Sequence, residues 1–141
     1  MNAPLYDARI LALATQVPDV RLDAPMGVSE KRSPLCGSRV TVAVNLDGAR
    51  RVREIGLTVH ACALGQASAA LLAADIVGRD AAELAGARDA LTAWLAGTGP
   101  LPPWPGMDAL ARARDFPARH GSIRLAFEAA AAAALMAGGA G

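Results

Sequence analysis

Two cysteines and two histidines are the sulfur and imidazole side chains of this sequence that could carry sulfur or bind a soft metal ion. Cys36 lies in the turn-like stretch SPLCGSR, before a strand-like run, and Cys62 precedes a helical segment in VHACALGQASA. A thiol at a helix N-terminus has its thiolate favoured by the unpaired backbone N–H groups and by the helix dipole. The thiolate is the form that attacks sulfur and ligates metals. Both kinds of chemistry are therefore open to these residues.

The segments around the cysteines predict that the two thiols lie at one end of a β-sheet. Apolar and polar residues alternate over residues 39–46 and again over residues 51–60, with the turn signal Asp47-Gly48 between them. Counting back along such a hairpin puts Cys36 and Cys62 at the same end. Spacing alone favours the alternative that each cysteine is a small buried apolar residue.

The remaining segments are predicted to be one further strand and several helices. Helical periodicity, Pro and Gly signals and capping residues define them. The predicted elements are a strand at 26–33, helices at 4–16, 63–77 and 80–95 (with an Asp80/Glu83 capping box), a short helix at 107–113 and a last helix capped by Ser122. We therefore expect one α+β domain over residues 1–141, with a small three-stranded antiparallel sheet covered by helices.

Composition excludes several classes of protein. The 141 residues carry a formal net charge of +1, without the basic excess that binding to nucleic acid requires. The longest apolar run is alanine-rich and contains Glu128, so we expect no membrane-spanning segment. The N-terminus lacks a signal-peptide pattern, which predicts a cytoplasmic protein. In that reducing compartment the two cysteines are expected to be thiols or ligands and not a disulfide.

Three blocks of the sequence resemble the NifU-like iron–sulfur cluster assembly scaffolds. The first is SPLCGSR followed by the hairpin, and the second is CALGQASAALLAADIVG. The third, ARDALTAWL with MDALARARDFPARHGSIRLAFEA, is similar to the SufU-type branch, and LYDARIL is similar to the opening helix of the family. The resemblance covers nearly the whole chain and implies a NifU-like, SufU-type sandwich.

The resemblance also implies a metal or cluster site with three cysteines and one aspartate. Carried over to this chain, two of those positions are Cys36 and Cys62. The aspartate position is Ser38, and the third cysteine position, at the start of the last helix, is Ser122. Serine is a poor ligand for zinc or iron at neutral pH because its oxygen stays protonated, whereas thiolate and imidazole are preferred.

The two histidines offer substitutes for the missing ligands. His60 lies two residues before Cys62, and His120 lies two residues before Ser122. Two sulfurs and two nitrogens are a common tetrahedral zinc composition. The alternatives are a solvent-facing strand residue for His60 and a backbone-bonded loop residue for His120. The predicted metal set is Cys36, Cys62, His60 and His120.

The function implied by the resemblance is iron–sulfur cluster assembly. Cys36 would accept sulfur from a cysteine desulfurase, at most as a sulfurtransferase-like acceptor, and the site would hold zinc or an iron–sulfur cluster. The expected partners are the desulfurase and cluster-accepting proteins, with no nucleic acid and no membrane. The alternatives are a degenerate, non-catalytic accessory or a zinc-stabilised domain that regulates a desulfurase.

Overall fold

Three strands form one antiparallel sheet, as predicted. The computed structural model of the chain describes residues 7–34 and 37–139. The strands are β1 (Gly27–Arg32), β2 (Arg39–Leu46) and β3 (Val52–His60), in the order β1-β2-β3. Arg39 of β2 pairs with Arg32 on one side and with His60 on the other, so these three residues mark one end of the sheet. The strands predicted at 26–33, 39–46 and 51–60 are confirmed.

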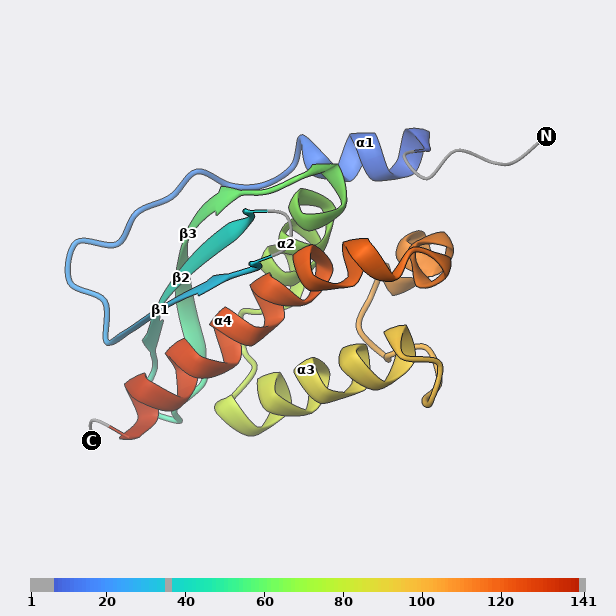
Figure 1. Cartoon of the computed structure of the whole chain (residues 1–141). Coiled ribbons are helices and arrows are strands. Elements are labelled where there is room, and N and C mark those ends of the chain that lie inside the picture. The colour runs from blue at the N-terminus through green and yellow to red at the C-terminus, as the bar shows by residue number, and fades with distance from the viewer. Residues whose placement is uncertain (1–6, 35–36, 140–141) are drawn as a thin grey trace.

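The helices gather on one face of the sheet and complete the predicted α+β sandwich (Figure 1). The elements are α1 (Ala8–Ala14), α2 (Ala63–Asp75), α3 (Ala81–Leu95), the 3₁₀ helices η1 (Met107–Asp115) and η2 (Pro117–Arg119), and α4 (His120–Gly139). Helix α4 runs across β1 and β2, with α2 beside it. Helix α3 packs on α4, and α1 packs on α2.

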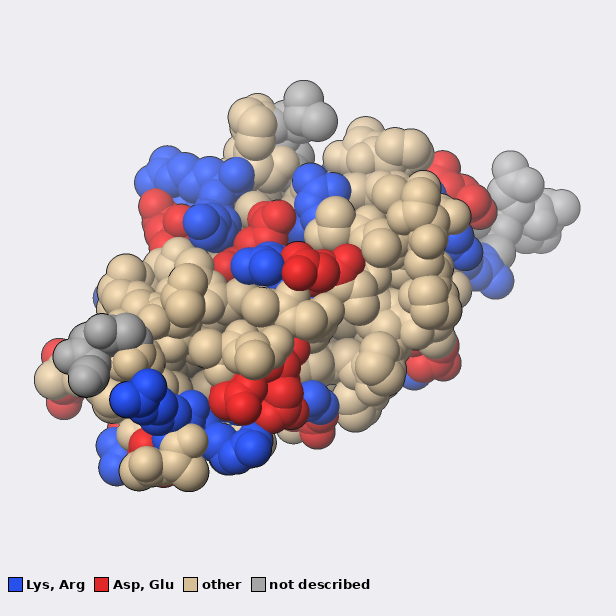
Figure 2. All heavy atoms as spheres, turned by 90° about the horizontal axis from the view of Figure 1, so that it is seen from below, with Lys and Arg blue, Asp and Glu red and all other residues tan. Residues whose placement is uncertain are grey.

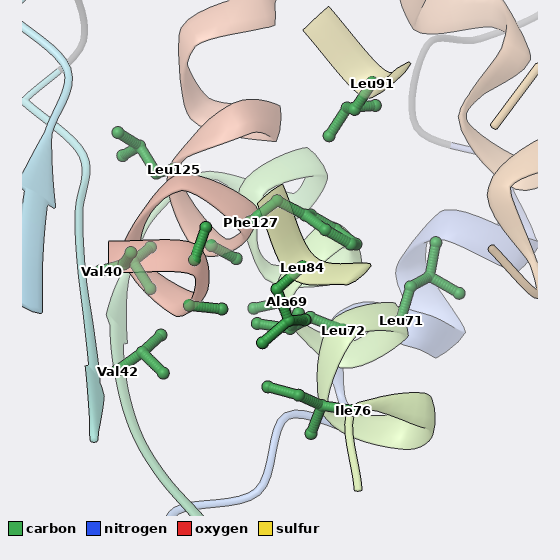
Figure 3. Packing of buried hydrophobic residues seen from close by; sticks show 14 of the residues in the cluster. Val40, Val42, Ala69, Leu71, Leu72, Ile76, Leu84, Leu91, Leu125 and Phe127 are labelled. Carbon is green, nitrogen blue, oxygen red and sulfur yellow. The ribbon is translucent and has the colours of Figure 1, made fainter. Parts of the chain in front are cut away.

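The alternating pattern of β2 determines which face of the sheet is covered. Val40, Val42 and Val44 are fully buried, while the residues between them are only partly covered. In Figure 3, Val40 and Val42 face a core that includes Leu72 of α2 and Phe127 of α4. Burial of this apolar surface is the main force that holds the helices to the sheet.

Helix α4 is the central helix of this core. By length and composition alone, Pro117–Gly138 could cross a membrane, but 61% of its apolar 18-residue stretch is buried inside the protein. Its alanines face both the sheet and the neighbouring helices, and they let these elements approach closely. The apolar run near the C-terminus is therefore explained by its place in the core.

The hairpin and the first helix lie where they were predicted. The turn signal Asp47-Gly48 lies in the loop that joins β2 to β3, and Leu46 pairs with Val52 across its base. The Asp47 carboxylate accepts hydrogen bonds from the backbone N–H groups of Ala49 and Arg51, at 2.9 and 3.0 Å, and so stabilises this loop. The first helix begins after the N-cap Asp7 and ends at Ala14, within the predicted range of 4–16, whose first residues lie outside the described part.

The other helix predictions agree with the structure apart from their ends. Asp80 caps α3 by accepting a hydrogen bond from the backbone N–H of Glu83, at 2.8 Å, as predicted. Helix α2 ends at Asp75, two residues before the predicted end. The predicted short helix at 107–113 is the 3₁₀ helix η1, which continues to Asp115.

Charges of opposite sign lie next to one another on the surface (Figure 2). One such pair ties α1 to η1, with 2.7 Å between Arg9 Nη1 and Asp108 Oδ2. The hydrogen bond from Arg9 holds the pKa of Asp108 below its ordinary value. A carboxylate with a lowered pKa stabilises the fold above its unfolded-state pKa, and this contribution is lost as the pH falls through the lowered value.

We expect Asp108→Asn to lower the melting temperature slightly at neutral pH and to have no effect in strong acid. The effect is small because the two side chains are 52% and 62% exposed. Melting curves of both proteins between neutral pH and about pH 2 test this, since they cross the ordinary aspartate pKa of about 3.9. High salt should reduce the difference at neutral pH. A difference that grows as the pH falls would contradict the assignment.

Candidate functional site

Three segments of the chain meet at the end of the sheet marked by Arg39 and His60. They are the described residues of the β1–β2 loop (33–34 and 37–38), the start of α2 and the start of α4. The loop is closed at its base, because the Ser33 N–H donates to the Ser38 carbonyl at 2.9 Å. Cys36 lies outside the described residues, so its proximity to Cys62 stays a prediction. The register of β2 and β3 does bring the residues that follow Cys36 to the same end as Cys62.

The described part of this site centres on a pair of serine hydroxyls. The Oγ atoms of Ser38 and Ser122 lie 2.9 Å apart, so one hydroxyl donates to the other. Both residues are buried, with 4% and 0% of their surfaces exposed. These are the two positions at which the family resemblance implies an aspartate and a third cysteine. The fold therefore brings these two family positions together, but with neutral hydroxyls in place of anionic ligands.

The predicted N-cap role of Ser122 is wrong. Helix α4 begins at His120, and η2 leads directly into it, so Ser122 is the third residue of the helix. Its hydroxyl bonds across the core to Ser38, 84 positions earlier in the chain. Local sequence resembles a capping pattern here, but the long-range partner decides what the hydroxyl does.

Cys62 lies at the N-terminus of α2, as predicted. It is the N-cap residue, and its side chain makes no capping hydrogen bond. The thiol is free and half-buried, and it packs against the edge of the apolar core. Its carbonyl accepts the first helical hydrogen bond, from the Gln66 N–H at 2.9 Å. Cys62 is therefore held on a rigid element and still partly open to solvent.

Helices α2 and α4 approach each other closely beside the serine pair. A Cβ atom added at Gly65 would lie 3.3 Å from the Ser122 carbonyl oxygen and 2.6 Å from the Ala61 Cβ. One turn further along, the Ser68 hydroxyl donates to the Ile123 carbonyl at 2.7 Å. Gly65 therefore positions the turn that carries Cys62 against Ser122.

Sequence analysis missed the glycines of this site. Gly121, directly before Ser122, lies so close to the β1–β2 loop that an added Cβ would be 2.9 Å from Ser33 Oγ. Glycine inside a helix lowers its stability, so Gly65 and Gly121 needed a reason that local sequence does not supply. The signal in the sequence was their position, since Gly65 lies three residues after Cys62 and Gly121 lies directly before Ser122.

The two histidines are in different environments. His60 is the last residue of β3 and is exposed. The Nε2 atom of His120 lies 3.1 and 3.0 Å from the carbonyl oxygens of Ala113 and Arg114. Since carbonyls only accept, Nε2 carries a proton and donates to them. This contact ties the start of α4 to η1.

The metal set Cys36, Cys62, His60 and His120 stays a prediction, because Cys36 lies outside the described residues. Within residues 7–34 and 37–139, no group of three or more His, Cys, Asp or Glu side chains could hold a metal. The serine pair also does not match the donors that the family site implies, because neutral hydroxyls are poor ligands for zinc and iron.

Comparison with known proteins identifies the family. No protein-family model and no curated protein matches this sequence. The crystal structure of the N-terminal part of a nitrogen-fixing NifU-like protein from Brucella abortus is 36% identical, with a TM-score of 0.90. The match covers 97% of this chain and 96% of that one. This chain belongs to the NifU-like family.

A second solved structure has the same fold as this NifU-like protein. It is the putative iron–sulfur cluster assembly scaffold protein for the SUF system from Fervidobacterium islandicum, with a TM-score of 0.83 and 18% identity. The match covers 92% of this chain and 96% of that one. The predicted family and the predicted fold are thus both confirmed, and the general function of the family is iron–sulfur cluster assembly.

Proposed function

We propose that this NifU-like protein accepts sulfur from a cysteine desulfurase, with Cys36 as the acceptor, and passes it on for iron–sulfur cluster assembly. The observation that supports this role is the buried hydrogen bond between Ser38 and Ser122. Two family ligand positions are hydroxyls that bond to each other, which leaves Cys36 and Cys62, the two cysteines of the sequence, as the soft donors. Thiols without a full ligand set are suited to carry sulfur.

The proposed step is a thiol exchange. The Cys36 thiolate attacks the outer sulfur of the desulfurase cysteine persulfide. A new S–S bond forms on Cys36 as the S–S bond of the donor breaks, and the desulfurase cysteine leaves as a thiolate. The sulfane sulfur keeps its oxidation state, so the step needs no oxidant or reductant. Pro34 and Gly37, on either side of Leu35 and Cys36, are residue types that favour a turn, and both are exposed.

Cys62 is the proposed second thiol of the site. Its position on the rigid start of α2 is suited to receiving sulfur from Cys36 or to holding a nascent cluster as cargo. Two thiolates per chain can hold such a cluster when a second chain or histidine supplies the remaining ligands. The proteins that take up the sulfur or the cluster are the second proposed class of partner. The cytoplasmic location remains a prediction.

We expect Cys36→Ser to abolish sulfur acceptance and Cys62→Ser to leave the first transfer intact. The protein is incubated with a cysteine desulfurase and cysteine, alkylated, digested, and analysed by peptide mass spectrometry. Wild type should gain the mass of one sulfur atom on the peptide that contains Cys36. Circular dichroism shows whether each variant is folded.

Two results would contradict the proposal. Sulfur found on Cys62 and none on Cys36 would show that Cys36 is not the acceptor. If neither thiol is labelled, and both variants change the desulfurase rate as wild type does, the non-catalytic accessory function is correct instead. His60→Ala and His120→Ala, analysed for metal content, test the predicted histidine ligands in the same series.

A further inference from the structure

We infer that this chain has no resident metal ion at the position that its family implies, and that the Ser38–Ser122 hydrogen bond takes over the structural role of such an ion. In a metal site of this kind, one ligand from the β1–β2 loop and one from α4 are held together by the ion. Here a hydrogen bond joins the same two elements directly. The inference concerns metal and not sulfur transfer, so its test does not depend on the proposed function.

The geometry of the pair is that of a hydrogen bond. The two oxygens are 2.9 Å apart, within the ordinary range for O–H···O contacts. Two oxygen ligands of one tetrahedral zinc ion would lie about 3.4 Å apart, given zinc–oxygen bonds of about 2.1 Å. The hydroxyl hydrogen of one serine therefore lies between the two oxygens, which are too close together to be two ligands of one zinc ion.

The charge of the site also disfavours a divalent cation. An aspartate and a cysteine thiolate at these positions would contribute two negative charges, whereas two serines contribute none. Both hydroxyls are buried, so ionising either one would place a charge in a poorly solvated site. Among the described residues, no group of three or more His, Cys, Asp or Glu side chains could hold a metal here in place of the two serines.

The surrounding contacts keep the site assembled without an ion. The Ser33 N–H closes the β1–β2 loop onto Ser38, and Gly121 lies directly against Ser33. Gly65 lies against Ser122, and the Ser68 hydroxyl bonds to Ile123. The loop, α2 and α4 are thus joined by hydrogen bonds and close packing. We therefore expect a chelator to leave the fold and the melting temperature unchanged.

The decisive experiment restores the implied ligands. We expect the double variant Ser38→Asp/Ser122→Cys, purified with added zinc, to bind about one zinc ion per chain. Its melting temperature should fall by more than about 5 °C when a chelator removes the metal. Wild type and the matched control Ser38→Asn/Ser122→Ala should bind far less zinc and show no chelator effect. Metal is measured by elemental analysis, and melting by circular dichroism.

Three results would overturn the inference. The first is the finding that wild-type protein purifies with about one zinc ion per chain and loses stability when a chelator is added. Another is a folded double variant that binds no more zinc than its control. If the double variant does not fold, the single variant Ser122→Cys is measured, since it adds a third thiol with the smallest change in size. The inference is then overturned if Ser122→Cys binds no more zinc than wild type does.

Discussion

Gly27→Ala is expected to lower the free energy of unfolding by about 3 kcal/mol or more. Gly27 is the first residue of β1 and is buried beneath α4. A Cβ atom there would lie 2.0 Å from the Ala133 carbonyl oxygen and 2.9 Å from the Ala137 nitrogen. Both contacts are with helix backbone, which cannot rotate away as a side chain can. The substitution must therefore push α4 off the sheet.

Two other glycines provide controls for the same change. Gly86 is an exposed residue in the middle of α3, and an added Cβ would meet nothing within 4 Å. Gly86→Ala should raise the free energy of unfolding by up to about 1 kcal/mol, because alanine favours the helix. Gly48 is also exposed and open, so Gly48→Ala should have little effect. Urea unfolding of the four proteins measures this order.

The result also separates stability from function. Gly27 pairs with Val44, at the end of the sheet opposite the one marked by Arg32, Arg39 and His60. Folded Gly27→Ala protein, kept well below its melting temperature, should therefore still accept sulfur. A Gly27→Ala protein as stable as wild type, to within about 0.5 kcal/mol, would show that β1 and α4 do not approach as described.

Phe127→Ala is expected to cost about 3–5 kcal/mol of stability. Phe127 of α4 is 1% exposed and lies inside the hydrophobic core (Figure 3). Its ring meets the Trp104 ring edge-on, with 5.1 Å between centroids and an angle of 85°. Trp104 is itself held by a hydrogen bond from Nε1 to the Leu71 carbonyl, at 2.8 Å. The variant leaves a cavity that these neighbours cannot fill.

Phe116→Ala is the matched control, since Phe116 is 44% exposed. Removing it should cost about 1 kcal/mol, because almost half of its surface stays in water in the folded protein and its loss leaves no closed cavity. Chemical denaturation of both variants gives the comparison. Equal losses for the two phenylalanines would mean that Phe127 does not occupy the core position given to it here.

The sheet could be predicted because each strand carries its own pattern. The valines of β2 recur with the period of a strand, at Val40, Val42 and Val44. This pattern determines which face of β2 is buried, and it does not depend on which helix covers that face. Asp80 caps α3 through the backbone N–H of Glu83, three residues away, which is a local interaction. Such features depend on neighbours in sequence, and they were predicted correctly.

The site could be predicted only in part. The family resemblance pointed to Ser38 and Ser122, and the structure brings these two residues into contact. The capping role predicted for Ser122 failed, because a hydroxyl near a helix start can bond locally or across the core. The turn signal at Asp47 is local, and its carboxylate stabilises the hairpin loop through two backbone N–H groups. For Ser122 a local and a long-range partner compete, and packing selects the long-range one.

Residue types and their period were enough to establish the class of fold, the elements and the two thiols of this NifU-like chain. Those properties depend on the hydrophobic pattern and on the chemistry of single side chains. The hydrogen bond between Ser38 and Ser122 and the approach of Gly65 to α4 emerged from the folded chain alone. Each joins residues that pack together only when the sheet and the helices are assembled, because burial brings distant segments within hydrogen-bonding distance.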